Sequence, residues 1–217
     1  MKRLAIIIAV LTALLLASGS QVPVPTSAIS PPIAHYTMVD ISWAVESYPG
    51  NASSTVHLNG TAQEVIQQLI EINPEYPVDD SPIEGLKNTI PDAAANTPPG
   101  ANEKPSTSEV CTARWSQARY TEINNGIRHL RHLQPGRPAM GPGPAACGRV
   151  SCSYDSAIWW CNDNSERKEL DAWDHIADFA EVILHLCQWQ DDGEEYFTRG
   201  QLFDSEGWNV IVRGDSC

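Results

Sequence analysis

The positions of the six cysteines constrain this chain more than any other feature of its sequence. They are Cys111, Cys147, Cys152, Cys161, Cys187 and Cys217, so all of them lie between residues 111 and 217. An even number of cysteines within one short region of a secreted protein is typical of a disulfide framework. We therefore predict three disulfides, whose pairing the sequence leaves open.

The cysteine spacing does not favour a metal site. The local pattern is Cys147-x4-Cys152-x8-Cys161, and it contains no Cys-x-x-Cys pair of the kind that binds structural zinc. His129 and His132 lack an accompanying Glu-x-x-His motif, and the acidic stretch 191–195 lacks the alternating ligands of a calcium loop. We expect no metal and no cofactor, and we predict that 191–195 forms a turn.

The first residues predict secretion. Lys2-Arg3 precede an apolar run from Leu4 to Ala17, and small residues follow at once. This run is shorter than the ~20 residues that span a bilayer, so it indicates a signal peptide over residues 1–19 rather than a membrane anchor. We expect a secreted, extracellular protein that is not a membrane protein.

Two sequons agree with passage through a eukaryotic secretory pathway. They are Asn51-Ala52-Ser53 and Asn59-Gly60-Thr61, and they predict N-linked glycans on Asn51 and Asn59.

The charge of the chain makes nucleic acid a poor partner. Asp and Glu together number 27 against 14 Lys and Arg, which gives a net charge of −13. Binding to nucleic acid requires a basic surface, and this sequence has no basic run.

Composition divides the chain into two parts. Twelve of the 16 prolines fall between Gln21 and Val110, where no cysteine occurs. We predict a Pro-rich linker at 20–34, a small β-β-α segment at 35–78, a Pro/Ala-rich linker at 79–110 and a cysteine-rich domain at 111–217. Thr61 and Glu64 form a capping box that opens a helix ending at Asn73. The segment 35–78 either docks on the cysteine-rich domain or serves as a pro-segment.

The cysteine-rich part shows both helical and strand periodicity. Helices are predicted at 117–133 and from Asn164 or Ser165 to Cys187, strands at 149–154, 157–161 and 208–213, and a loop at 134–144. The predicted fold class is α+β, with a small disulfide-stapled antiparallel sheet covered by two helices and preceded by the β-β-α segment and the linker.

Two neighbouring tryptophans are candidate binding residues. Trp159 and Trp160 point to opposite faces if the chain is extended there, so one belongs in the core and the other is a candidate for exposure. Core packing is the favoured role for most of the tryptophans. An exposed indole can stack on a sugar or anchor a protein partner.

No catalytic residue is predicted with comparable support. Asp174-His175 invites a general acid/base role, yet Asp171, Asp174 and Asp178 also fit a solvated acidic helix face. No Gly-x-Ser-x-Gly motif occurs, and the cysteines are needed for disulfides. We expect that the protein is not an enzyme.

The stretch from Pro142 to Asn164 carries a family resemblance. Its string Cys147-Gly-Arg-Val-Ser-Cys152, followed by the helix to Cys187 and by Gly207-Trp208 to Cys217, resembles a family of fungal small secreted cysteine-rich proteins, often called candidate effectors. The order of cysteines, strands and helix more distantly resembles the α/β-sandwich killer toxins encoded by viruses of smut fungi. The second resemblance implies a stable extracellular ligand that acts on a target cell.

Three functions therefore compete. The first is a non-enzymatic secreted effector or killer-toxin-like monomer that acts on a protein or glycan of a host or competitor cell surface. The second is a cell-wall carbohydrate-binding module that uses Trp159 or Trp160. The third is a secreted hydrolase that uses Asp174 and His175.

Overall fold

A computed structural model describes residues 30–78, 110–133 and 136–217. The predicted signal peptide, most of both predicted linkers and residues 134–135 of the predicted loop lie outside these ranges. The described residues form an α+β fold with three disulfides, which confirms the predicted fold class.

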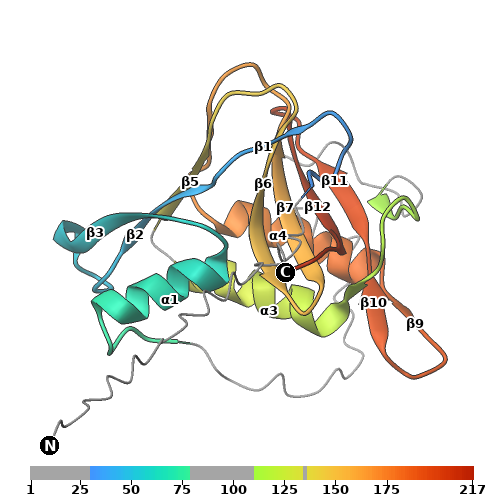
Figure 1. The fold of residues 1–217 in the computed structure, drawn as a ribbon, viewed down its shortest axis with the longest axis horizontal. Coiled ribbons are helices and arrows are strands. Elements are labelled where there is room, and N and C mark those ends of the chain that lie inside the picture. The colour runs from blue at the N-terminus through green and yellow to red at the C-terminus, as the bar shows by residue number, and fades with distance from the viewer. Residues whose placement is uncertain (1–29, 79–109, 134–135) are drawn as a thin grey trace, which may run out of the picture.

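A five-stranded sheet is the centre of the fold (Figure 1). Its strands, in spatial order, are β1 (Thr37–Met38), β6 (Ala146–Ser153), β7 (Ser156–Asn162), β12 (Trp208–Gly214) and β11 (Gly200–Phe203). All neighbours run antiparallel except the short parallel pair β1 and β6. β7 and β12 are buried along almost their whole length, as expected for strands covered on both faces.

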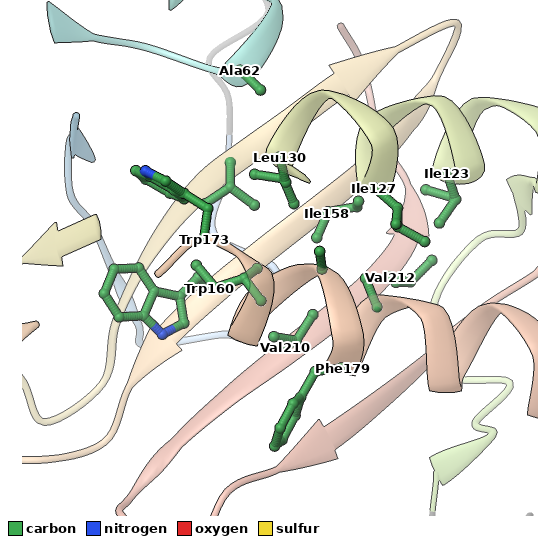
Figure 2. Close-up of a cluster of buried hydrophobic side chains, with 14 of the residues drawn as sticks. Ala62, Ile123, Ile127, Leu130, Ile158, Trp160, Trp173, Phe179, Val210 and Val212 are labelled. Carbon is green, nitrogen blue, oxygen red and sulfur yellow. The ribbon is translucent and has the colours of Figure 1, made fainter. Parts of the chain in front are cut away.

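Two helices cover one face of this sheet. They are α3 (Tyr120–His132) and α4 (Asp174–Leu186), and they pack against each other and on the strands. Figure 2 shows Ile127 of α3 and Phe179 of α4 beside Ile158, Val210 and Val212 of the sheet. The apolar stripes of both helices therefore face the same core.

A smaller cluster covers the opposite face. Trp115, Trp159 and Ile211 lie in it together with the Cys147–Cys161 disulfide. The indole N–H of Trp115 donates to the carbonyl of Pro32 at 2.8 Å, so the start of the described chain closes this side.

Two further sheets flank the first. A four-stranded sheet has the order β3 (Thr55–Asn59), β2 (Ser42–Glu46), β5 (Gly136–Met140) and β8 (Lys168–Glu169). A three-stranded sheet has the order β4 (Ala118–Arg119), β10 (Tyr196–Thr198) and β9 (Trp189–Gln190). A 3-10 turn, η1 (Ala52–Ser54), precedes β3, and α1 (Ala62–Ile72) follows it.

The β-β-α segment packs into the main core. β2 pairs with β5, and Trp43 of β2 stacks on Trp173 with ring centroids 3.4 Å apart. Both indoles are fully buried, and the Trp43 N–H donates to the carbonyl of Gly60 at 2.7 Å. A Cβ on Gly148 of β6 would lie only 2.2 Å from the Cδ1 of Ile41, so glycine permits this close approach. The structure shows the segment docked on the cysteine-rich part of the chain.

Local signals explain α1 well. The Thr61 and Glu64 side chains form the predicted capping box, and Val65, Ile66 and Leu69 are buried on one side. The helix ends at the predicted place, where the Asn73 side chain donates to the carbonyl of Ser47.

The predicted loop at 134–144 is wrong in part, because residues 136–140 form β5. Pro138 lacks an N–H. Its carbonyl points away from β2 and accepts from the N–H of Leu170 at 3.1 Å. The proline therefore occupies a position where the ladder with β2 needs no donor from it.

The predicted start of the second helix is also wrong. α4 begins at Asp174, and Lys168–Glu169 pair with β5 instead. Asn164, which was expected to cap the helix, donates its side-chain amide to the carbonyls of Glu206 and Gly207. Its hydrogen bonds thus connect the segment after β7 to the turn between β11 and β12.

Replacing Trp43 with alanine tests how strongly the segment supports the core. The change removes the stack on Trp173 and leaves a cavity, so we expect a loss of about 3–5 kcal/mol in the free energy of unfolding. Urea denaturation followed by circular dichroism measures it. Ile72→Ala, at a side chain that is 43% exposed, is the control and should change stability by less than about 1 kcal/mol. A Trp43→Ala variant as stable as this control would contradict the shared core.

Candidate functional site

Two of the three disulfides join elements that are distant in the sequence, and the third joins the consecutive strands β6 and β7. Cys147–Cys161 links register partners on β6 and β7, Cys152–Cys217 ties the end of β6 to the C-terminal residue, and Cys111–Cys187 ties residue 111 to the end of α4. All six cysteines are paired, as predicted.

Neither candidate tryptophan is exposed, so both pack in the core, as favoured for most of the tryptophans, and the candidate binding role of Trp159 or Trp160 is wrong. Trp159 and Trp160 do point to opposite faces of β7, but both have zero exposed area. Trp160 lies in the core under the helices, and Trp159 lies in the cluster on the other face, where its N–H donates to Asp215 at 3.0 Å. The sequence pattern did not reveal that the second face is also covered.

An exposed aromatic residue lies instead at the tip of the β6–β7 hairpin. Tyr154 is 75% exposed, the highest value among the large hydrophobic residues that the structure describes as exposed. Tyr154 and Asp155 have φ values of 42° and 58°, and Ser153 pairs with Ser156 across them. Two central residues with positive φ form the tight turn that matches the twist of a hairpin. Sequence reasoning missed this residue, although a Tyr-Asp pair between two strand-like runs was the available signal.

Several contacts hold this tip in place. The Cys152–Cys217 disulfide lies two residues before Tyr154, and the N–H of Asp215 donates to the carbonyl of Asp155 at 3.0 Å. The hydroxyl of Ser153 donates to Glu122 of α3 at 3.0 Å. The Tyr154 backbone is therefore tied to the C-terminal strand and to a helix.

The second candidate site is an acidic pocket at the start of α4. It has a volume of about 300 Å³ and is lined by residues of the β8–α4 region and of the β11–β12 turn, namely Glu169, Leu170, Asp171, His175, Asp204, Ser205, Glu206 and Trp208. His175 thus shares a pocket with carboxylates, whereas Asp174 is not among the lining residues. Asp171 and Asp178 are on the surface, where each forms an ion pair with an arginine.

Asp204 is the least expected residue of this pocket. It is 5% exposed, and one carboxylate oxygen accepts from the N–H of Glu206 at 2.7 Å. Burial raises the pKa of Asp204 above its usual 3.8, while that hydrogen bond opposes the rise. A hydrogen bond from Lys168 lowers the pKa of the exposed Glu206 beside it.

A polar network joins α3 to α4 outside this pocket. Arg131 donates to Asp178 at 2.8 Å and to Glu181 at 2.7 Å. His185 and Arg131 together lower the pKa of Glu181 to about 2. His132, one of the two histidines without a metal motif, contacts the carbonyl of Pro77. The contacts of Arg131 with Asp178 and Glu181 thus hold α3 and α4 together.

Both predicted glycosylation sites lie on the surface of the β-β-α segment. Asn51 is exposed and caps η1 by accepting from the N–H of Ser53 at 3.1 Å. Asn59 is exposed at the end of β3. Either side chain can therefore carry a glycan without unfolding its element.

The described residues contain no group of three or more His, Cys, Asp or Glu side chains placed to hold a metal ion. None of the described helices has the length and apolar content to cross a bilayer. The 191–195 stretch is a turn between β9 and β10, where Asp191 accepts from the N–H groups of Gly193 and Glu195.

Comparison of the chain with protein-family models, curated proteins and solved structures finds no match. The resemblances to fungal secreted proteins and to killer toxins therefore stay predictions.

Replacing Asp204 with asparagine tests the electrostatics of the pocket. A raised pKa means that the folded state disfavours the ionised carboxylate, so this penalty is absent below about pH 3.8 and grows as the pH rises through the folded pKa. The asparagine side chain stays neutral, and its amide oxygen can still accept from the N–H of Glu206. We expect Asp204→Asn to raise the melting temperature near pH 7 and to leave it unchanged near pH 3. Asp192→Asn, in the exposed β9–β10 turn, is the control, and a variant equally shifted at both pH values would contradict the argument.

Proposed function

We propose that this protein is a secreted, disulfide-stabilised, non-enzymatic effector or killer-toxin-like protein, which acts on a host or competitor cell surface. The observation that carries this proposal is the exposed Tyr154, which a disulfide-linked hairpin holds at the tip of the central sheet.

The hairpin has the properties of a preorganised binding element. Tyrosine combines a large apolar ring with a hydroxyl, and it is enriched among residues that dominate binding energy at interfaces. Fixing its backbone before binding lowers the entropy that association costs. The tip therefore offers a partner an anchor that needs little rearrangement.

The disulfides support the extracellular part of the proposal. Such bonds persist in oxidising compartments and are rare in the cytosol. Secretion through the predicted signal peptide and glycosylation at Asn51 and Asn59 belong to the same proposal.

Cell-wall carbohydrate binding is the alternative that Tyr154 also allows. Its ring can stack on a sugar, whereas Trp159 and Trp160 are buried and cannot do so. Retention on chitin or glucan that depends on Tyr154 would replace a protein target with a wall glycan.

Cell assays with the secreted chain test the proposal. Oxidised protein is applied to plant leaf tissue and to fungal cells, and cell death and growth are recorded. We expect activity on one of them, and we expect Tyr154→Ala to raise the half-maximal dose by about 30-fold, because loss of an interface anchor costs about 2 kcal/mol. Tyr48→Ala is the matched control, since Tyr48 is also an exposed tyrosine but lies in another turn.

A second variant separates the aromatic ring from its fixed position. Cys152→Ser/Cys217→Ser keeps Tyr154 but removes the covalent tie between the hairpin and the C-terminus, so we expect reduced potency in this variant too. Lack of activity on both cell types, or equal potency of Tyr154→Ala and wild type, would contradict the proposal. If His175→Ala abolished an activity that Tyr154→Ala left intact, the hydrolase hypothesis would take its place.

A further inference from the structure

The edge strand β3 lacks the charged residues and the prolines that usually protect an edge. It is the terminal strand of the order β3-β2-β5-β8, and Figure 1 shows it at the outer margin of the N-terminal elements. Its sequence, Thr-Val-His-Leu-Asn, contains no lysine, no proline and no acidic residue. Natural proteins use such residues, bulges or covering elements to keep edges from pairing with other chains.

The strand register shows which backbone groups of β3 point outward. Pro138 directs its carbonyl to Leu170, away from β2, so its partner Trp43 must form its ladder bonds with Leu58 of β3. Because this pattern alternates along an antiparallel pair, Val56 and Leu58 bond to β2, whereas Thr55, His57 and Asn59 point outward. A side-chain contact agrees with this alternation: the amide of Gln68 donates to the outward-pointing carbonyl of Asn59 at 3.0 Å.

His57 is the centre of the outward-facing edge. The N–H of Thr55 already donates to the Ala52 carbonyl, and the carbonyl of Asn59 already accepts from Gln68. Within the described residues, the outward N–H and C=O of His57 have no such intramolecular partner.

The strand is complementary to itself. In an antiparallel pair centred on His57, the two His57 residues exchange N–H···O=C bonds, and each Asn59 N–H faces the Thr55 carbonyl of the other copy. The same register places Val56 opposite Leu58 on the face that already packs against the core. This pairing thus uses the backbone groups of β3 that have no partner within one described chain: the N–H and C=O of His57, the N–H of Asn59 and the carbonyl of Thr55.

The two sequons lie at the two ends of this edge. Asn59 is the last residue of β3, and Asn51 precedes η1, which leads directly into Thr55. A glycan on Asn59 would occupy the space beside Thr55 of the second copy.

We propose that β3 is a self-association edge: without a glycan on Asn59 it pairs antiparallel with β3 of a second copy around His57, and the glycan blocks this pairing. The block by the glycan rests on the glycosylation included in the proposed function, whereas the pairing of two β3 strands does not rest on it. The glycosylated chain would be the monomer expected from the sequence.

The test compares glycosylated and unglycosylated full chains secreted from a eukaryotic host. Ser53→Ala/Asn59→Gln removes both sequons but keeps the Asn51 cap and the Thr61 capping box. Mass spectrometry gives the glycan occupancy, and size-exclusion chromatography with light scattering gives the protein mass. We expect a monomer when Asn59 is occupied and a twofold larger protein mass in the variant, rising with concentration.

Charge at the centre of the edge provides the matched control. In the sequon-free background, His57→Lys places two ammonium groups opposite each other and should restore the monomer. Ser42→Lys adds the same charge on β2, one strand inward from the edge, and should stay dimeric.

A monomeric sequon-free chain would overturn the proposal, as would a glycosylated dimer or an equal response to the two lysine variants. An unoccupied Asn59 in the wild-type chain would refute its glycosylation. In that case the edge proposal requires the wild-type chain itself to be dimeric, and a monomer would refute it.

Discussion

The stack of Trp43 on Trp173 is the contact on which the rest of the structure depends. It lies where β2 pairs with β5, so it joins a segment without cysteines to the disulfide-linked part of the chain. Val65 and Leu69 of α1 belong to the same buried cluster as α3, α4 and the central sheet. A domain that buries one continuous core gains more stability than two small units would gain separately.

Covalent and noncovalent constraints act on different parts of the molecule. The three disulfides connect residues 111–217 among themselves, whereas packing and hydrogen bonds hold the segment 30–78 in its place. The disulfides therefore restrain the end that carries Tyr154, while the segment contributes the edge strand β3 and both sequons. The molecule therefore has a rigid aromatic tip at Tyr154 and, at a separate place, the edge strand β3, whose pairing a glycan on Asn59 would block.

Local chemistry explains which features could be predicted from the sequence. The capping box at Thr61 and the even number of cysteines act within a few residues or through composition, and each prediction was confirmed. β5 was missed because Pro138 is compatible with a strand only when its carbonyl faces β8. The burial of Trp159 depends on Trp115 and on residues near Pro32, far away in the sequence. The buried Asp204 likewise depends on tertiary contacts that no periodicity encodes.

Native-state hydrogen exchange of the intact, oxidised chain tests the shared core most directly. If Trp43 and Trp173 join one cooperative unit, the most protected amides of α1 and β2 should exchange through the same global opening as those of β6, β7 and β12. Their opening free energies should also fall together as urea is added. Exchange of α1 and β2 through a separate opening of much lower free energy would show that the segment is only loosely attached, and would contradict the account.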